Sequence, residues 1–141
     1  MLRFDQLGLS DPMLQAIADL GFTEPSEVQQ QAIPILLEGV SDLVALAQTG
    51  TGKTAAFGFP MLQLINPESR TTQGLILSPT RELCLQIANE LKLYGKYVPG
   101  LNVVPVYGGA SVQEQVKAIK KGAQIIVATP GRMKDLIGRG V

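Results

Sequence analysis

The chain has 141 residues with a formal net charge of zero, 45% hydrophobic side chains and 17% charged ones, a balance typical of a globular protein with a sizeable core. It contains no histidine and one cysteine, which excludes histidine-based triads and zinc sites, imidazole general bases, internal disulfides and thiolate metal clusters. No apolar run is long enough to cross a membrane and the N-terminus lacks a secretory pattern, so we expect a cytoplasmic protein with no membrane partner.

Charge is distributed unevenly along the chain. Residues 1–69 carry two basic and eight acidic side chains, whereas residues 70–141 carry ten basic and four acidic ones. The net charge therefore changes from −6 to +6. This asymmetry predicts a basic face built by the later part of the chain, although half of the excess is also compatible with ordinary solvated helix surface.

The first predicted element is an amphipathic helix that opens at Asp11-Pro12. Leu14, Ile17 and Leu20 recur at helical spacing and are expected to share its apolar face. Gly21 is a typical residue for the C-terminal stop of such a helix.

A second helix is predicted from Ser26 toward Glu38. Ser26 and Gln29 have the spacing of a capping box, in which each side chain bonds to the backbone amide of the other residue. Pro34 interrupts this helix and is expected to bend it.

From residue 42 onward, short apolar runs alternate with helical stretches. The runs are rich in β-branched residues and lack polar alternation, which is typical of strands buried on both faces. Alternating strands and helices imply right-handed crossovers and a parallel sheet, in which ligands gather at the C-terminal strand ends. Cys84, in the second of these helices, is expected to be a small buried apolar residue rather than a reactive thiol. The predicted strands are Leu43–Ala47, Leu75–Leu77, Val103–Val106 and Ile125–Ala128, and the predicted helices cover residues 53–65, 80–94, 111–121 and 131–138.

A glycine-rich segment joins the first predicted strand to the helix after it. Its sequence is Ala47-Gln48-Thr49-Gly50-Thr51-Gly52-Lys53-Thr54, which fits the phosphate-binding loop pattern apart from alanine at the first position. Glycines permit the close approach that loop amides need to reach phosphate oxygens, and the helix dipole assists them. Lys53 is expected to place a positive charge on the outer phosphates, and Thr54 a hydroxyl on Mg²⁺. The alternative is a glycine-rich turn before an ordinary helix.

Together with this loop, four further ordered motifs resemble the front part of the first RecA-like domain of a DEAD-box ATP-dependent RNA helicase of the bacterial type. The resemblance extends over essentially the whole chain. The motifs are the Q motif at residues 21–29 with the upstream aromatic Phe4, motif I at 47–54, motif Ia at Pro79-Thr80-Arg81-Glu82-Leu83, the GG motif Gly108-Gly109, and motif Ib at Thr129-Pro130-Gly131-Arg132.

The resemblance implies an α/β fold. We expect a partial RecA-like P-loop domain, with a parallel sheet flanked by helices and an N-terminal helical Q-motif region. Residues 1–40 would form the Q-motif region and residues 41–141 an incomplete ATP-binding domain, within a single structural domain overall.

The resemblance also implies that ATP or ADP binds together with Mg²⁺. Residues Ala47 to Thr54 would hold the phosphates, and Thr54 would contact Mg²⁺ through the nucleotide. Gln29 would bond to the N6 and N7 edge of adenine, because its amide offers one donor and one acceptor, and Phe4 would stack on the base. The capping role of Gln29 competes for the same amide, which does not fully serve both.

A track for the RNA backbone is implied by the resemblance as well. Some of its residues follow a predicted strand and precede a helix, so that helix amides are available for phosphates. Such contacts do not read bases, and binding is therefore expected to be sequence-independent and sensitive to salt. The alternative for Thr80 and Thr129 is a role as helix caps only. The residues of the track are Pro79, Thr80, Arg81, Gly108, Gly109, Thr129, Pro130, Gly131 and Arg132.

Catalytic residues are not found in the chain. Hydrolysis of ATP by this class of protein needs a carboxylate at the end of another strand, and no predicted strand ends in Asp or Glu. The Asp-Glu-Ala-Asp and Ser-Ala-Thr motifs and the second RecA-like domain are expected beyond Val141. We therefore expect an inactive fragment of a protein that uses ATP to remodel short RNA duplexes, and an incomplete sheet that favours self-association.

Other classes of function are less consistent with these residues. A GTPase normally selects guanine with Asn-Lys-x-Asp, and no Asn in this chain is followed by Lys. A small-molecule kinase needs an acceptor pocket and an arginine-rich lid, which we do not find. A non-enzymatic module that binds nucleotide without chemistry stays open as an alternative.

Overall fold

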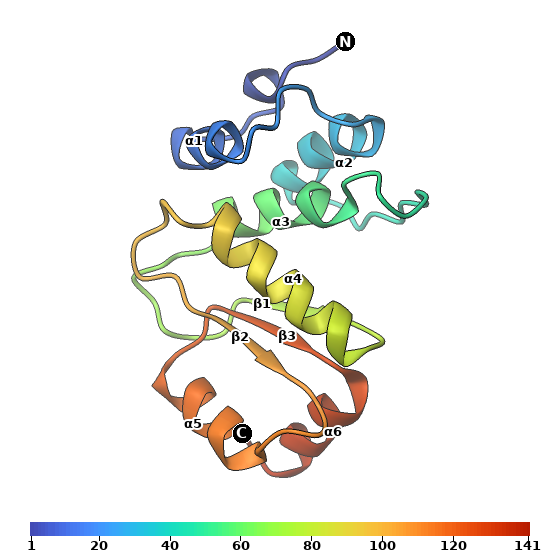
Figure 1. Cartoon of the computed structure of the whole chain (residues 1–141). Coiled ribbons are helices and arrows are strands. Elements are labelled where there is room, and N and C mark those ends of the chain that lie inside the picture. Colours follow the sequence, from blue (N-terminus) through green and yellow to red (C-terminus); the bar gives the residue numbers. More distant parts are fainter. The chain divides into compact units, whose positions relative to one another are not determined.

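A computed structural model describes residues 1–141, and the chain divides into two compact units (Figure 1). Unit 1 consists of Met1–Leu64 and Leu93–Val98, and unit 2 of Ile65–Lys92 and Pro99–Val141. Residues 1–40 lie within unit 1, and the predicted domain division at residue 40 stays a prediction. No helix in either unit is both long and apolar enough to span a membrane.

Unit 1 is helical. It contains the 3-10 helix η1 (Phe4–Gln6) and the α-helices α1 (Asp11–Asp19), α2 (Glu27–Glu38) and α3 (Lys53–Leu64), and α2 packs against α3. The apolar side chains that these elements bury include Phe4, Met13, Ile17, Ile33, Phe59 and Leu62.

Helix α1 begins and ends close to the predicted positions, but its buried face differs from the prediction. Met13, Ala16 and Ile17 are buried, whereas Leu14 is only partly covered. These three residues have the i, i+3, i+4 spacing of one helical face, and Leu14 lies on the neighbouring one. The prediction is therefore confirmed for Ile17, whereas Leu14 and Leu20 are only partly covered.

Helix α2 begins with the predicted capping box. The Ser26 hydroxyl accepts from the Gln29 amide at 3.4 Å, and Gln29 Oε1 accepts from the Ser26 amide at 3.0 Å. The helix runs through Pro34 to Glu38 and is not interrupted there. Proline removes one backbone hydrogen bond from the helix. Helix α2, which packs against α3, continues through Pro34 in spite of this loss.

The segment Leu43–Ala47, which was predicted to be a strand, does not form one. None of its residues pairs with the sheet, and Val44 and Leu46 are 89% and 96% exposed. A strand needs a neighbour that takes up its backbone N–H and C=O groups. The segment has the composition of a buried strand, but no described strand lies beside it.

Unit 2 is built on a parallel sheet. The strands are β1 (Gly74–Leu77), β2 (Val103–Val106) and β3 (Ile125–Ala128), in the order β1-β3-β2. All three agree with the predicted positions to within one residue. The central strand β3 is buried along its whole length, as expected for a strand between parallel neighbours.

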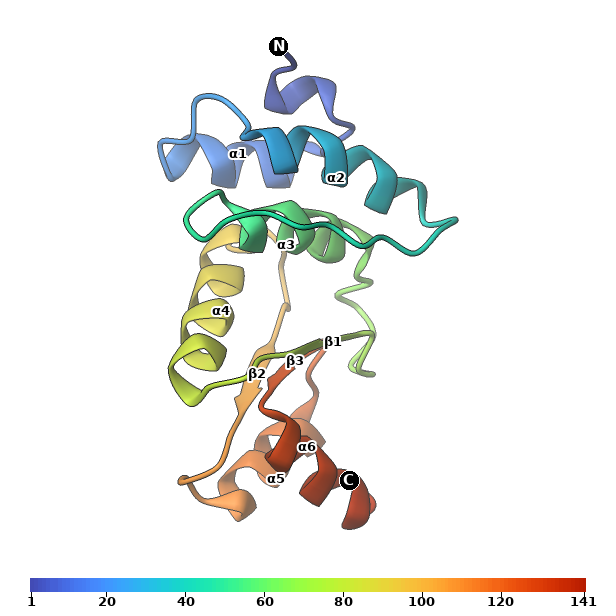
Figure 2. The same cartoon turned by 90° about the vertical axis from the view of Figure 1, so that its right-hand side faces the viewer.

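Helices cover both faces of this sheet, as Figures 1 and 2 show. Helix α4 (Arg81–Tyr94) lies over one face, and α5 (Val112–Lys121) and α6 (Pro130–Gly138) lie over the other. On the α4 side, Cys84 is fully buried, as predicted, and its thiol lies 3.2 Å from the Val127 carbonyl. The core on the α5 and α6 side consists of Val104, Val106, Ala123, Ile126, Ala128 and Leu136. Unit 2 is thus an α/β unit with a parallel sheet flanked by helices, as predicted.

A buried glutamine joins the loops at the N-terminal ends of these strands. Gln124 is 2% exposed and its Oε1 accepts from the Asn102 amide at 2.8 Å. Its Nε2 lies 3.0 Å from the Ser69 carbonyl and 3.2 Å from the Gly100 carbonyl. One amide thus satisfies backbone groups of two separate loops, which would otherwise be left without partners.

Candidate functional site

The glycine-rich loop of unit 1 has the backbone geometry that a phosphate-binding loop requires. Gly50 and Gly52 have φ angles of 79° and 84°, in the left-handed region that favours glycine. Helix α3 begins at Lys53, directly after Gly52. The structure therefore places a helix N-terminus behind two glycines, as the sequence predicts.

The amides of this loop are free. No backbone N–H from Gln48 to Thr54 donates a hydrogen bond within the chain. Two side chains close the loop on itself instead, since Thr51 Oγ1 donates to the Gln48 carbonyl at 2.6 Å and Lys53 Nζ donates to the Ala47 carbonyl at 2.8 Å. Free amides at a helix N-terminus form a site suited to an anion.

Gln29 contacts the loop directly. Its Nε2 donates to the Gly52 carbonyl at 3.1 Å, while its Oε1 accepts from the Ser26 amide. The side chain is buried, with 6% exposed. The capping interpretation of Gln29 is confirmed by this geometry, and its contact with adenine stays a prediction.

Gly52 provides the space that Gln29 occupies. A methyl group added at Gly52 would collide with Gln29 Nε2 and would lie 3.2 Å from its Cδ. Glycine is therefore required at this position for two reasons, the left-handed φ and the close approach of the glutamine amide.

Phe4 is placed in the core of unit 1. It lies in η1 and is 6% exposed. Stacking on a base requires an accessible ring face, and little of the Phe4 ring is accessible in this conformation. Its predicted contact with adenine stays a prediction.

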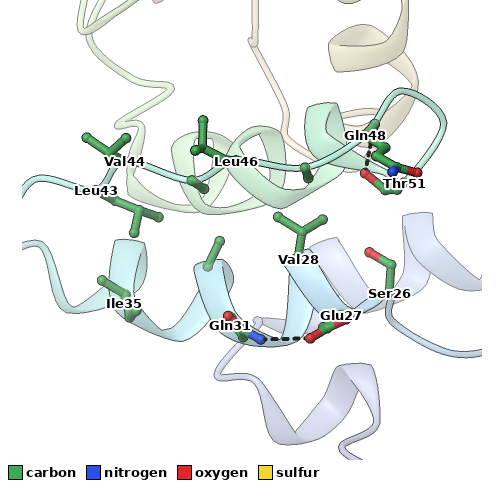
Figure 3. Close-up of a pocket in the computed structure, with 13 residues that line it drawn as sticks. Ser26, Glu27, Val28, Gln31, Ile35, Leu43, Val44, Leu46, Gln48 and Thr51 are labelled. Carbon is green, nitrogen blue, oxygen red and sulfur yellow. Dashed lines mark hydrogen bonds between the residues drawn. The ribbon is translucent and has the colours of Figure 1, made fainter.

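A cavity of about 540 Å³ lies beside the glycine-rich loop in unit 1. Figure 3 shows side chains of α2, including Val28 and Ile35, facing the extended segment that carries Leu43 and Leu46. Gln48 and Thr51 of the loop also line it, whereas Gln29 and Phe4 do not. The cavity therefore does not coincide with the predicted adenine contacts.

In unit 2, the nine residues of the predicted RNA track follow the C-terminal ends of the three strands. Because the strands are parallel, these ends meet at one edge of the sheet. The Thr129 amide donates to the Val106 carbonyl at 3.0 Å, which continues the pairing of β2 and β3 to this edge. Exposed residues there include Pro79, Thr80, Arg81, Gly108, Gly109, Pro130 and Gly131, while Thr129 and Arg132 are half-buried.

The two threonines of this edge differ in their capping. The Thr80 hydroxyl accepts from the Leu83 amide at 3.2 Å and so caps α4. Thr129 stands at the N-cap position of α6 but makes no side-chain cap hydrogen bond. Thr80 is thus a helix cap, whereas the Thr129 hydroxyl is not used in this way, and the contact of either threonine with RNA stays a prediction.

Arg132 and Arg81 both contact the loop that contains the two glycines. Arg132 Nη1 and Nη2 each lie 3.2 Å from the Ala110 carbonyl. The Arg81 guanidinium lies over the Tyr107 ring, 4.9 Å from its centroid, within the range of a cation–π interaction. Three predicted RNA-contacting segments are therefore brought together around the 107–110 loop.

A residue that the sequence did not identify completes this arrangement. Gln115 Oε1 accepts from Arg132 Nη1 at 2.8 Å, and its Nε2 donates to the Tyr107 carbonyl at 3.1 Å. In the sequence, the role of Gln115 was indicated by its position among Val112, Val116 and Ile119, on the apolar side of α5. Tyr107 was likewise not predicted as part of the site.

Neither arginine has a carboxylate partner. The ion pairs of the chain join Arg3 to Asp5, Lys96 to Asp19, and Arg139 to Asp135. The positive charges of Arg81 and Arg132 are therefore not neutralised by an ion pair, which suits a surface that attracts phosphate.

A site for Mg²⁺ requires oxygen ligands. No group of three or more acidic, cysteine or histidine side chains lies together in the chain, and the strands end in Leu77, Val106 and Ala128. The Thr54 hydroxyl makes no hydrogen bond to the protein and is half-buried at the start of α3. The Thr54 hydroxyl is therefore available as one oxygen ligand, and Mg²⁺ binding with a nucleotide stays a prediction.

Comparison with known proteins decides the family. Residues 26–140 match the family described as DEAD/DEAH box helicase. The chain belongs to this family. It is 48% identical over 139 residues to the ATP-dependent RNA helicase DeaD of Haemophilus influenzae, and 50% identical over 138 residues to the DEAD-box ATP-dependent RNA helicase CshA of Streptococcus pneumoniae. These alignments cover 99% and 98% of the chain but only 22% and 26% of the relatives.

Solved structures support the same assignment to the DEAD/DEAH box helicases. A DEAD box protein from Methanococcus jannaschii superposes with a TM-score of 0.93 at 41% identity, covering 99% of this chain and 38% of that one. Dbp5 of S. cerevisiae, bound to RNA and ADP BeF3, superposes with a TM-score of 0.86 at 35% identity, covering 98% and 34%. The resemblance stated from the motifs is therefore confirmed.

Proposed function

We propose that this DEAD/DEAH box helicase chain binds ATP through the Ala47–Thr54 loop of unit 1 and the backbone of RNA through the strand ends of unit 2. The whole protein would then be an ATP-dependent RNA helicase, as its much longer relatives are named. The observation that carries the proposal is the row of free amides from Gln48 to Thr54 before helix α3.

The phosphates of the nucleotide would take the place of contacts that the loop now makes with itself. The loop amides donate to phosphate oxygens without first breaking any hydrogen bond of the protein. Lys53 Nζ exchanges the Ala47 carbonyl for an outer phosphate, a stronger partner because it is charged. The Thr54 hydroxyl would hold Mg²⁺, and the ion would shield the charge of the phosphates.

Recognition of adenine would fall to Gln29. Its amide already holds the Gly52 carbonyl and the Ser26 amide, so contact with the base requires it to exchange one of these partners or to share one. The base contact and the position of the loop are then linked through one side chain. Phe4 stacks on the base only if η1 moves to uncover the ring.

RNA would be held by its backbone. Dbp5, to which 98% of this chain is similar in structure, was solved bound to RNA. In unit 2, Arg81 and Arg132 supply charge without carboxylate partners, and Gly108 and Gly109 leave the backbone exposed for close approach. Such contacts carry no base specificity, so affinity falls with salt and depends little on sequence.

Hydrolysis would require residues from outside this chain. The described strands supply no carboxylate to hold Mg²⁺ or to orient water. The chain alone would then bind nucleotide without turnover, and ATPase activity would need a carboxylate that these strands do not carry.

Nucleotide titration tests the proposal. ATP and ADP should bind with Mg²⁺ more tightly than GTP, and Lys53→Ala should weaken ATP binding by tenfold or more, roughly the value of one charge-assisted contact. Lys117→Ala, which removes an exposed lysine of unit 2, is the matched control and should leave ATP binding unchanged. Equal affinity for GTP and ATP would favour another class of P-loop protein, and ATP binding that Lys53→Ala does not affect would refute the site.

A further inference from the structure

Gln115 is one of four buried polar side chains in the chain, with 8% of its surface exposed. It lies on the side of α5 that faces the sheet, among apolar neighbours. A polar group in such a place costs stability unless its hydrogen bonds are made. Both ends of the Gln115 amide make a hydrogen bond. One partner is Arg132 of the predicted RNA track, and the other is Tyr107, next to Gly108 of that track.

The two hydrogen bonds fix the amide in one orientation. Oε1 accepts from Arg132 Nη1 at 2.8 Å, and Nε2 donates to the Tyr107 carbonyl at 3.1 Å. Only the nitrogen can donate to a carbonyl and only the oxygen can accept from a guanidinium. Gln115 therefore links α6, which carries Arg132, to the residue at which the 107–110 loop begins.

Arg132 is held by neutral groups and keeps its charge. Its contacts are the Ala110 carbonyl and Gln115 Oε1. These use at most three of the five N–H groups of a guanidinium, so at least two remain for another acceptor. A carboxylate in the place of Gln115 would hold the guanidinium equally well, but would cancel its charge.

The side chains of Gln115 and Arg132 hold the two ends of the 107–110 loop. Gln115 holds the Tyr107 carbonyl and Arg132 holds the Ala110 carbonyl. The Arg81 guanidinium lies over the Tyr107 ring, and a methyl group added at Gly109 would lie only 3.3 Å from Arg81 Nη1. An exposed glycine loop that is fixed in this way loses little conformational entropy when a ligand binds.

We propose that Gln115 is a positioning residue for RNA binding. It orients Arg132 and the 107–110 loop toward the RNA backbone, and because it is neutral it leaves the arginine charge available to a phosphate. This proposal rests on the proposed function, since it requires that this edge of unit 2 binds RNA. Gln115 itself does not touch the RNA.

Two substitutions separate positioning from charge. In Gln115→Glu the carboxylate still accepts from Arg132, but it neutralises the guanidinium and cannot donate to the Tyr107 carbonyl. In Gln115→Met the shape is approximately kept and both hydrogen bonds are lost. Binding of a fluorescent single-stranded oligouridylate, followed by anisotropy over a series of KCl concentrations, measures both the affinity and its salt dependence.

The expected results differ between the two variants. Gln115→Glu should weaken binding and reduce the slope of log K against log[KCl] by about 0.7, the contribution of one phosphate contact to a single strand. Gln115→Met should weaken binding by roughly three- to tenfold with a smaller change in slope, since the charge remains but is less well placed. A purely structural role would lower the unfolding temperature without changing the slope of the folded protein.

Three further variants serve as controls. Gln113→Glu adds the same charge to the same helix at an exposed position and should change the slope less than Gln115→Glu. Gln124→Met removes a buried glutamine at the opposite end of the strands and should lower stability without changing the slope. Thermal unfolding identifies which variants are folded, and Gln115→Glu decides the result if Gln115→Met is not.

Arg132→Gln separates failure of this proposal from failure of the proposed function. If Arg132→Gln changes neither the affinity nor the slope, Arg132 does not contact RNA; the positioning role of Gln115 then fails together with the RNA contact proposed for Arg132, while ATP binding by unit 1 is unaffected. If Arg132→Gln reduces the slope but Gln115→Glu behaves like Gln113→Glu, the positioning role of Gln115 is overturned and RNA binding at this edge stands.

Discussion

Gln29 Nε2 lies 3.1 Å from the Gly52 carbonyl, in the space that a side chain at position 52 would fill. This hydrogen bond joins the first turn of α2 to the phosphate loop before α3. The position of the loop in unit 1 therefore depends on a glutamine that is 23 residues away in sequence.

Gly52→Ala should disturb this contact. The added methyl group displaces the Gln29 amide, and alanine at a φ of 84° is strained. We expect a loss of about 1–2 kcal/mol from the backbone angle and about 1 kcal/mol more from the displaced amide. Urea unfolding measures the stability, and titration with ATP should show weaker binding.

Gly50→Ala is the matched control for Gly52→Ala. Gly50 has a similar φ of 79°, but nothing lies within 4 Å of the position that a methyl group would take. It should therefore show the strain of the backbone angle without the displacement of Gln29. If the two variants lose the same stability, the close approach of Gln29 to the loop contributes nothing.

A surface cluster in unit 1 predicts a dependence of stability on pH. Lys96 Nζ lies 2.7 Å from Asp19 Oδ2, and the Tyr97 hydroxyl donates to the same oxygen. The hydrogen bond from Lys96, followed by that from Tyr97, lowers the pKa of Asp19 from its ordinary value of 3.8. A carboxylate with a lowered pKa in the folded state stabilises the protein above the unfolded pKa, and this contribution is lost as pH falls through the folded pKa.

Asp19→Asn tests the cluster. The substitution should lower the unfolding temperature at neutral pH, because asparagine carries no charge for Lys96. The difference from the unsubstituted chain should begin to shrink as the pH falls below the unfolded pKa of about 4, and should vanish only at lower pH, once Asp19 is protonated in the folded state as well. Added salt should also reduce it, since the cluster is exposed. A difference that stays constant from neutral to acidic pH would contradict the role of the charge.

Much of unit 2 is predictable from sequence, because its elements are encoded locally. The apolar runs Val103–Val106 and Ile125–Ala128 are strands, and a helix follows each of them at the expected position. The glycines of the phosphate loop also encode their own backbone angles. These features depend on periodicity and on glycine, which are visible in a single sequence.

The rest depends on partners that are distant in the chain. Leu43–Ala47 has the composition of a strand, but pairing requires a neighbour that its own residues do not specify. Gln115 was missed because its role exists only when α6 brings Arg132 beside α5. Gln29 was correctly predicted as a capping residue, but its bond to the Gly52 carbonyl follows from the packing of α2 on α3.

Gln124 should be important for the stability of unit 2. Removing its side chain leaves the Asn102 amide and the carbonyls of Ser69 and Gly100 without their partner. A fully buried group that loses its hydrogen bond costs about 1–3 kcal/mol. Because Ser69, Asn102 and Gly100 are not fully buried, Gln124→Ala should lower the free energy of unfolding by about 2–4 kcal/mol in urea, less than three full losses. Gln113→Ala, at an exposed position, is the control and should change it by less than about 0.5 kcal/mol. Similar losses in both variants would show that the buried hydrogen bonds are not what stabilises these loops.

The outer edge of the sheet predicts self-association. Strand β1 stands at the end of the order β1-β3-β2, so one side of its backbone has no strand neighbour. Leu75 and Leu77, in this edge strand, are 49% and 57% exposed. Because alternate residues of a strand point to the same face, the two side chains lie on one face of β1. An open edge with apolar side chains is a template for another chain, and sedimentation velocity should show species larger than the monomer that increase with concentration.

Leu77→Lys should shift this equilibrium toward the monomer, since a charged side chain at an exposed edge opposes pairing with a second sheet. The substitution is compatible with the fold, because the side chain already faces solvent. Gln86→Lys adds the same charge at an exposed position of α4 and controls for the change in net charge. If the unsubstituted chain sediments as a monomer at all concentrations, or if Gln86→Lys is as effective as Leu77→Lys, the edge of β1 does not drive association.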